Sequence, residues 1–385
     1  MEEEDIDVLE ENKDELEVVY LDELEEIEDV ELDDELNDQE DASTSDFINQ
    51  QAIDLSKLSF NKHTKSVFTG ALSKSGLLAA TGGEDDIAYV WSVENGDVVL
   101  ECTGHKDSVT EVAFNFNDQY IATGDMCGLI QVWSLNEKKL IWCYEGDDME
   151  WLMWHHLANV LISGCESGDI YVWQIPEGHC KVLASQGTST TCAKVLSDGK
   201  RLLAGYGDGQ VRLWNLKSGN VLWQLTTNIP TDGVTSLDVT DDSSLLVVAP
   251  SAQLFKVVDG HQVASYLLTN ENEVEVVAFN NELGLLATGA LSGKFCVWDY
   301  KKNSLRHEAK LETPITTIKW GPRDMLIVGG TDGCIYVCDA KSGTLVEILT
   351  GHNADILSLT LSKDGTCILS TSDDATAKLF AIKVN

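Results

Sequence analysis

Basic residues are scarce in this chain: 26 Lys and Arg stand against 65 Asp and Glu among 385 residues, for a net charge of −39. So acidic a protein would repel the phosphates of nucleic acids and anionic membrane surfaces. Long apolar runs are missing too, since no segment approaches the ~18 consecutive apolar residues of a membrane-spanning helix. No basic stretch followed by an apolar one marks a signal peptide. We therefore expect no direct nucleic-acid binding, no membrane insertion, and a cytoplasmic location with the nucleus as an alternative.

Motifs for catalysis and metal binding are also lacking. The ten cysteines form no CxxC pair and no compact disulfide framework, which is typical of reduced thiols inside the cell. Cys334 and Cys338 lack further ligands at zinc spacing, so we interpret them as core residues. His155 and His156 are neighbours at a strand end, where we expect them to face opposite sides and not to share a metal. With no glycine-rich phosphate loop and no GxSxG elbow, the sequence predicts a protein without catalytic residues, cofactor or metal.

The acidic charge is concentrated in the first segment of the chain. Residues 1–50 hold 24 of the 65 acidic residues and one of the 26 basic residues, Lys13, which leaves 41 acidic and 25 basic residues for the rest. This charge density is too high for a packed core, so we expect residues 1–52 to be an acidic leader that is disordered when free. The leader is interpreted either as a solubilising tail or as a segment that folds onto a basic partner. The sequence leaves open whether it assists other binding or competes with it.

A repeat of about 41 residues fills the remainder of the chain. Each copy contains a short strand that ends in a bulky residue, as in IAYVWS, LIQVWS and KFCVWD. These anchor residues are Trp91, Trp133, Trp173, Trp214, Phe255, Trp298, Cys338 and Phe380. Successive spacings are 42, 40, 41, 41, 43, 40 and 42 residues, a regularity that chance does not produce. The apolar segments between turn residues predict four antiparallel strands in each copy.

This pattern resembles the WD-repeat family over about 330 residues. One four-stranded sheet cannot bury both of its faces, whereas sheets stacked radially bury each other. We therefore expect an all-β fold in which residues 53–385 form a single, monomeric, eight-bladed β-propeller. Residues 53–60 are expected to supply the outer strand of the last blade and so to close the ring. Pro250 interrupts the central hairpin of the fifth copy, and a seven-bladed ring with an insertion is the alternative.

The resemblance also implies polar tetrads of His, Ser or Thr, Asp and Trp, hydrogen-bonded within a blade. By spacing, the first copy has a complete set in His63, Thr81, Asp85 and Trp91. The second copy has His105, Thr123 and Trp133, with Cys127 where Asp is expected. The last copy has His352, Ser370 and Asp374, with Phe380 in place of Trp. We interpret these sets as structural rather than catalytic, because buried His and Asp side chains need satisfied hydrogen bonds.

In a WD propeller, the loops that enter the inner strands share one face with the turns before the anchor strands. Here these loops are rich in acidic residues, whereas turns expected on the opposite face, such as NLKSGN and DAKSGT, carry most of the lysines. We expect this acidic face to attract a basic protein. Its candidate partner-binding residues are Glu84, Asp86, Asp107, Asp147, Asp148, Glu150, Trp151, Glu166, Glu271, Glu273, Asp355 and Asp373. Trp151 either packs between blades or is an exposed aromatic anchor.

Within the WD-repeat proteins, the chain resembles the angio-associated migratory cell protein family, which includes a fungal member that chaperones a ribosomal protein. The resembling segments are the acidic leader, DDMEWLMWHH, LSDGKRLLAGYGDGQVRLWNLKSG, GHNADILSLTLSKDG and DDATAKLF. The resemblance implies a non-enzymatic chaperone that holds a newly made, basic large-subunit ribosomal protein, or its basic terminal segment, during ribosome biogenesis. The alternative is a scaffold in cell-migration or signalling complexes of the angiogenesis type. A heparin-binding basic run is attributed to some members, but the leader here has only Lys13.

Overall fold

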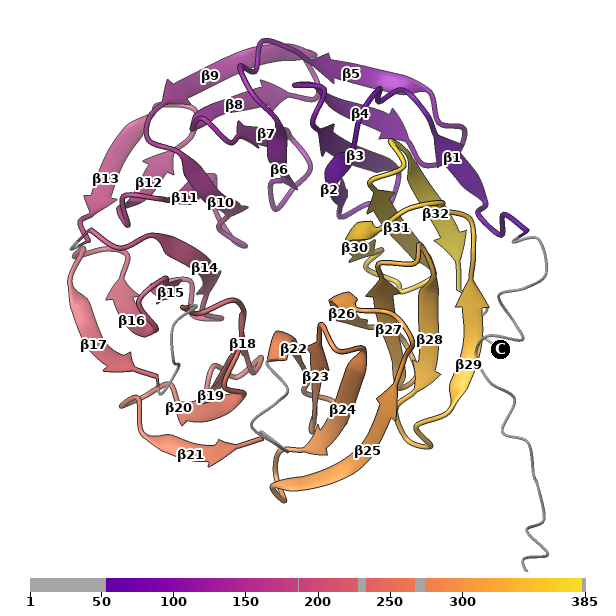
Figure 1. Ribbon diagram of the computed structural model, residues 1–385. Helices are drawn as coiled ribbons and strands as arrows, with labels where there is room; N and C mark the ends of the chain where they lie inside the picture. The colour runs from indigo at the N-terminus through magenta and orange to yellow at the C-terminus, as the bar shows by residue number, and fades with distance from the viewer. Residues whose placement is uncertain (1–52, 186, 228–232, 267–273, 383–385) are drawn as a thin grey trace, which may run out of the picture. The chain divides into compact units, whose positions relative to one another are not determined.

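The computed structural model describes residues 53–185, 187–227, 233–266 and 274–382, and the expected leader lies outside the described residues. The described residues form eight four-stranded antiparallel sheets. These sheets are arranged as blades around a central opening, with the first strand of each repeat at the inner edge (Figure 1). The predicted all-β, eight-bladed propeller is thereby confirmed.

The first four blades run from the inner to the outer edge in chain order. Their strands are β2 (Val67–Leu72), β3 (Leu78–Gly83), β4 (Ala88–Ser92) and β5 (Val98–Cys102) in blade 1, β6 (Val109–Phe114), β7 (Tyr120–Asp125), β8 (Leu129–Ser134) and β9 (Lys139–Glu145) in blade 2, β10 (Met149–Trp154), β11 (Val160–Cys165), β12 (Ile170–Gln174) and β13 (His179–Leu183) in blade 3, and β14 (Thr190–Val195), β15 (Arg201–Tyr206), β16 (Gln210–Asn215) and β17 (Val221–Thr226) in blade 4.

Blades 5 to 7 follow the same order, and blade 8 takes its outer strand from the start of the described chain. The strands are β18 (Leu237–Val239), β19 (Leu245–Val248), β20 (Gln253–Lys256) and β21 (Gln262–Ser265) in blade 5, β22 (Val274–Asn280), β23 (Leu285–Ala290), β24 (Lys294–Asp299) and β25 (Ser304–Lys310) in blade 6, β26 (Ile315–Trp320), β27 (Met325–Gly330), β28 (Ile335–Asp339) and β29 (Leu345–Leu349) in blade 7, and β30 (Ile356–Leu361), β31 (Cys367–Ser372), β32 (Ala377–Ala381) and β1 (Leu58–Phe60) in blade 8.

The irregular fifth copy forms a complete but small blade. Its four strands have only three or four residues each. Pro250 lies in the turn between β19 and β20, where its missing N–H interrupts no ladder bond. The seven-bladed alternative is therefore wrong.

Apolar residues of adjacent blades bury one another, so the core lies between sheets. Trp151 and Ile162 of blade 3, for example, cluster with Tyr206 and Trp214 of blade 4. Cys334 and Cys338 are both buried in the cluster between blades 6 and 7, as expected of core residues. This arrangement explains why the repeat has apolar residues on both faces of its inner strands.

Strand β1 joins the two ends of the ring. It pairs antiparallel with β32, with Leu58 opposite Leu379 and Phe60 opposite Ala377, and it is shorter than the 53–60 range expected from sequence. The Phe60 side chain is only 2% exposed. Its ring stacks on Trp91 of blade 1 with 4.7 Å between centroids and 6° between planes. The backbone of β1 therefore belongs to blade 8, while its aromatic side chain packs against blade 1.

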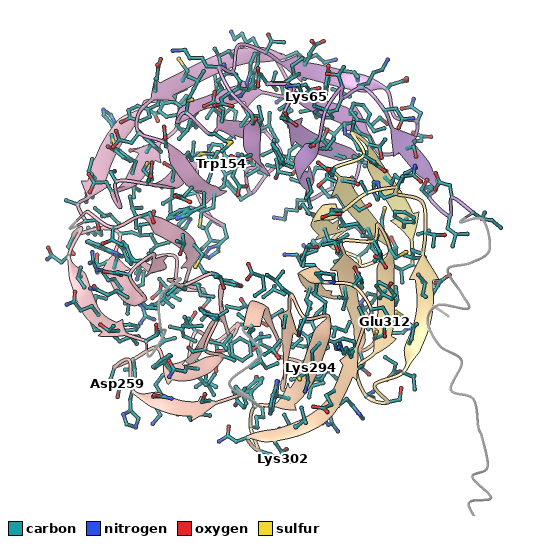
Figure 2. The ribbon with its side chains drawn as sticks, viewed as in Figure 1. Lys65, Trp154, Asp259, Lys294, Lys302 and Glu312 are labelled. Atoms are coloured by element: carbon teal, nitrogen blue, oxygen red, sulfur yellow. The ribbon has the colours of Figure 1, made fainter. Side chains whose placement is uncertain are left out.

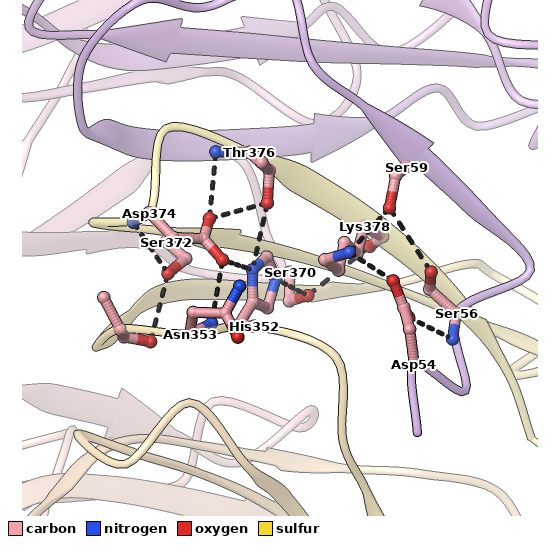
Figure 3. A network of polar contacts seen from close by, with 11 residues as sticks. Asp54, Ser56, Ser59, His352, Asn353, Ser370, Ser372, Asp374, Thr376 and Lys378 are labelled. Carbon is pink, nitrogen blue, oxygen red and sulfur yellow. Dashed lines mark hydrogen bonds and ion pairs between the residues drawn. The ribbon is translucent and has the colours of Figure 1, made fainter. Parts of the chain in front are cut away.

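A buried lysine strengthens this closure (Figure 3). Lys378 on β32 is 6% exposed, and its Nζ donates to Asp54 Oδ2 at 2.6 Å and to Ser59 Oγ at 2.7 Å. Burial alone would raise the pKa of Asp54, but the hydrogen bonds from Lys378 and Ser56 hold it below its ordinary value. Thr350 Oγ1 also donates to the carbonyl of Ile53 at 2.6 Å. The segment before β1 is thus tied to the last blade by charge-assisted hydrogen bonds.

Candidate functional site

Backbone hydrogen bonds place the two sets of acidic loops on one face. In blade 1, the N–H of Glu84, in the turn between the second and third strands, donates to the carbonyl of Ser66, just before the inner strand. The same bond joins Glu166 to Asp148 in blade 3 and Asp373 to Asp355 in blade 8. The loop that enters each inner strand therefore contacts the turn that precedes each anchor strand. We call this side of the ring the acidic face.

Most of the predicted partner-binding residues reach solvent on the acidic face. Those exposed are Asp86, Asp147, Asp148, Glu150, Glu166, Asp355 and Asp373, and those half-buried are Glu84 and Asp107. Lys65 Nζ lies 3.4 Å from Glu84 Oε1, and Ser66 Oγ donates to Asp373 Oδ1. Glu271 and Glu273 lie outside the described residues.

Three of these carboxylates gather on blade 3. Burial raises the pKa of Glu150, and the charges of Glu166 and Asp148 raise it further. Among the ion pairs of the described chain, none involves these three side chains. A cation placed among them would relieve their mutual repulsion, so this cluster is suited to a basic ligand.

Trp151 is a core residue rather than an exposed anchor. Its side chain is 6% exposed and packs between blades 3 and 4. The indole lies over Gly164, where an added Cβ would come within 2.3 Å of Cε2, so only glycine leaves room for the ring. The interpretation of Trp151 as a surface aromatic is therefore wrong. Nearby Trp154 lies at the end of β10 (Figure 2). Its Nε1–H donates to the carbonyl of Ala113 in blade 2.

Glu111 on β6 is a candidate residue that the loop-based reasoning missed. A β-bulge after Val109, which pairs with Asp125 while Glu111 pairs with Gly124, leaves Thr110 unpaired. Glu111 lines a cavity of about 500 Å³ along the inner strands, and burial raises its pKa to about 8 against a smaller opposing effect of Lys319. The one sequence signal that could have identified it is a glutamate inside the otherwise apolar and hydroxyl-bearing strand VTEVAF.

The tetrad of blade 1 forms as its spacing predicted. Trp91 Nε1 lies 3.4 Å from Thr81 Oγ1, and Thr81 Oγ1 lies 2.9 Å from His63 Nε2. His63 Nδ1 lies 2.9 Å from Asp85 Oδ1. Because the carboxylate can only accept, the chain of donors runs from indole to hydroxyl to imidazole to carboxylate. Every polar group is used inside the blade, which supports a structural rather than a catalytic role.

Blade 2 completes its tetrad from a different position. Asp125, two residues before Cys127, lies 3.1 Å from His105 Nδ1, so the spacing that pointed to Cys127 misplaced the acidic residue. The equivalent position in blade 1 is Gly83, where an added Cβ would lie 3.0 Å from His63 Nδ1. A side chain at this position therefore points at the histidine, and an aspartate there can replace the usual one.

The anchor tryptophan of blade 2 also has a different partner, because Trp133 Nε1 donates to Gln131 Oε1 at 3.2 Å. In blade 8, His352 Nδ1 lies 2.9 Å from Asp374 Oδ2 and His352 Nε2 lies 2.7 Å from Ser370 Oγ (Figure 3). Burial alone would raise the pKa values of the tetrad aspartates of blades 1, 2 and 8, but histidine and backbone hydrogen bonds hold them below their ordinary range.

The adjacent histidines do not face opposite ways. Strand β10 ends at Trp154, so His155 and His156 lie in the turn, and their rings stack with 4.8 Å between centroids. His155 Nε2 is 2.8 Å from the carbonyl of Gly199, and its Nδ1 accepts from the N–H of Leu157 at 3.1 Å. Both ring nitrogens are thus used within the fold. Over the described ranges, no group of three or more His, Cys, Asp or Glu side chains could hold a metal, and no helix is long and apolar enough to cross a membrane.

The fold and the tetrads define a WD-repeat β-propeller. Residues 55–92, 96–134, 177–215 and 343–380 match the family described as WD domain, G-beta repeat. The chain is 36% identical over 350 residues to the angio-associated migratory cell protein of Homo sapiens, an alignment that covers 86% of this chain and 81% of that protein. The same protein of Canis lupus familiaris is also 36% identical over 350 residues, covering 86% of this chain and 80% of that protein. The chain therefore belongs to the angio-associated migratory cell protein family.

More distant similarity extends to fungal proteins. The ribosome assembly protein SQT1 of Saccharomyces cerevisiae is 23% identical over 351 residues, which cover 80% of this chain and 81% of that protein. A crystal structure of Chaetomium thermophilum Sqt1 bound to the N-terminus of the ribosomal protein L10 superposes with a TM-score of 0.78 at 20% identity, covering 86% of this chain and 100% of that one. At such identity, the structural likeness establishes the shared fold.

Proposed function

We propose that this protein is a non-enzymatic binding module, a chaperone that holds a basic, newly made large-subunit ribosomal protein by its acidic face. The observation that carries the proposal is the carboxylate cluster of Asp148, Glu150 and Glu166, where burial and then repulsion raise the pKa of Glu150. The fungal Sqt1 structure, which contains the N-terminus of ribosomal protein L10, supports the choice of partner. We place its action in the cytoplasm, with the nucleus as an alternative.

The charges of the acidic face favour an extended basic segment over a folded basic domain. Apart from Glu150 on β10, the exposed carboxylates sit on loops of blades 1, 3 and 8, which lie along one arc of the ring from blade 8 to blade 3. A flexible Lys/Arg-rich segment can reach several of these loops in turn, and each new pair relieves repulsion among the carboxylates. The acidic field also speeds encounter with such a segment, an advantage for capture soon after synthesis.

The face also offers apolar contacts. Met126, in the turn between the second and third strands of blade 2, is 50% exposed, and Leu291 in the equivalent turn of blade 6 is 57% exposed. Partner segments with apolar residues between their basic residues would bury these side chains as well as pair with the carboxylates. The expected ligand is therefore an interrupted basic segment rather than a simple run of lysines.

A charge reversal with a matched control tests the proposal. Glu150→Lys should weaken binding of a peptide comprising the N-terminal segment of L10 by about tenfold or more, because it converts an attraction into a repulsion. Glu94→Lys makes the same change in net charge in the turn between β4 and β5, on the opposite side of the ring, and should change affinity less than about twofold. Peptide affinity is measured by fluorescence anisotropy with the full chain. Equal effects of the two variants on this affinity would contradict the assignment of the acidic face as the binding surface.

The second candidate function is a scaffold in cell-migration complexes, which is favoured by the name of the mammalian relatives. Affinity capture with the full chain separates the two functions. Enrichment of membrane and cytoskeletal proteins in place of ribosomal proteins, unaffected by Glu150→Lys, would favour the scaffold.

A further inference from the structure

The inner strands of blades 1, 2 and 8 border a hollow at the inner side of the ring, which we call the channel. Its cavity of about 500 Å³ is lined by residues of β2, β6 and β30, together with Lys319 of β26. Most of the lining is apolar or carries hydroxyl groups, as with Phe68, Thr110 and Thr360. Glu111 and Lys319 are the two charged residues in this lining.

Neither charged side chain is satisfied within the fold. Glu111 and Lys319 make no hydrogen bond or ion pair at contact distance with any residue of the described ranges, although their charges act on each other. The neighbouring Thr110 Oγ1 is buried and likewise lacks a hydrogen-bond partner. Lys319 is exposed and Glu111 is half-buried, but crowding by the surrounding inner strands still lowers the pKa of Lys319 and raises that of Glu111.

The ammonium of Lys319 lies within the electrostatic reach of three other inner strands. The carboxylates of Asp238 on β18 and Glu111 on β6 stabilise its charge, and Lys194 on β14 opposes it. Lys194 is itself paired with Asp238. Because these groups come from blades 2, 4 and 5 while Lys319 comes from blade 7, the long side chain must extend into the lumen rather than along its own sheet.

The two charges follow a fixed order along the channel. Inner strands start at the acidic face, since the loops that enter them form that face. Glu111 is the third residue of β6, whereas Lys319 is the fifth residue of β26. Lys319 therefore lies two residues further along its strand from the acidic face. A cationic side chain that arrives from the acidic face therefore meets Glu111 first and Lys319 beyond it.

We propose that Lys319 is a specificity-determining residue: its ammonium is an internal counter-charge to Glu111 that competes with the cationic side chain of a bound segment. The inference rests on the proposed function, because it assumes a basic segment on the acidic face. Lys319 limits how much positive charge can enter the channel, so the protein discriminates against segments that would insert a second cation. Because the pKa of Glu111 is raised to about 8, this group is largely protonated at pH 7. A ligand that inserts one cation therefore gains the pairing with Glu111 only by releasing that proton to solvent and overcoming the repulsion from Lys319.

Substitution of Lys319 tests the competition directly. Lys319→Met keeps an unbranched apolar stem of similar length and removes the charge, so affinity for the L10 N-terminal peptide should rise about fivefold. Lys319→Arg retains the charge and should bind like the wild type. Lys363→Met removes one charge from the turn between β30 and β31, on the opposite side of the ring, and should change affinity less than about twofold. Thermal melting of each variant shows whether the fold is intact.

The coupling to Glu111 is the decisive readout. In a Glu111→Gln background, Lys319→Met should change affinity less than about twofold, because the carboxylate for which the two cations compete is gone. A peptide with one more arginine should gain more from Lys319→Met than the original peptide does. The role of Lys319 is rejected if Lys319→Met leaves or lowers the affinity, or tightens it equally with and without Glu111. If Glu150→Lys still weakens binding in that case, the proposed chaperone function is kept and only the role of Lys319 is rejected. If neither the wild type nor any variant binds the peptide, the proposed function and the role of Lys319 are both rejected.

Discussion

Truncation of Phe60 tests how the ring is closed. Phe60 is 2% exposed and stacks on Trp91 of blade 1, although its backbone belongs to blade 8. Loss of a buried Phe side chain costs about 3–5 kcal/mol, against a typical total stability of about 5–15 kcal/mol. At about 2–4 °C per kcal/mol for a large domain, Phe60→Ala should lower Tm by roughly 6–20 °C. Circular dichroism melting of the full chain measures this shift.

A matched control separates closure from ordinary core packing. Phe295 is also 2% exposed, but it packs between blades 6 and 7, far from the closing strand in the chain. Phe295→Ala should lower Tm by a similar amount. Only Phe60→Ala should speed hydrogen exchange of β32, because β1 covers that strand through the Phe60–Ala377 and Leu58–Leu379 pairings. Equal exchange of β32 in the two variants would refute the idea that Phe60 holds β1 in place.

Three further predictions concern the tetrads and Trp151. Asp125→Asn should lower the free energy of unfolding by about 1–3 kcal/mol in urea titrations, whereas Cys127→Ala should change it by less than about 0.5 kcal/mol, and the opposite order would restore Cys127 as the tetrad position. The folded tetrad aspartates have lowered pKa values, so their stabilisation is complete above the unfolded carboxyl pKa of about 3.9 and is lost as pH falls through the lower folded values. The urea concentration at the midpoint of unfolding should therefore fall steeply below about pH 4, and less steeply in Asp125→Asn. A midpoint that stays constant down to about pH 2 would contradict these pKa shifts. Trp151→Phe should leave peptide affinity within about twofold because the ring is buried, and a larger loss in a folded variant would place Trp151 at the interface.

The period of the repeat predicts the fold because strands and turns recur along the chain at a fixed spacing, even where single residues differ between copies. Eight anchors at nearly constant spacing predicted eight blades, including the small fifth one, although its sequence is degenerate. The blade 1 tetrad could also be predicted, since its residues keep the family spacing. The role of Asp125 could not be predicted, because spacing alone does not reveal that a side chain at the position of Gly83 also points at the histidine.

The candidate site was less predictable than the fold. Loop carboxylates such as Asp148 and Glu166 could be found because turns are exposed in any propeller. The burial of Trp151 depends on Gly164 of the neighbouring strand, which only the pairing register reveals. Glu111 and Lys319 lie on different blades, and their shared channel exists only once the ring is closed.

The salt dependence of binding tests the central claim most directly. The full chain is titrated with the N-terminal peptide of L10 and with a scrambled peptide of equal composition, at low and at high salt. If the acidic face holds a basic segment, the L10 peptide should bind more tightly than the scrambled one, and its Kd should rise by about tenfold or more at high salt as the charges are screened. Glu150→Lys should reproduce much of that loss at low salt. Binding that is indifferent to both salt and Glu150→Lys would contradict the account.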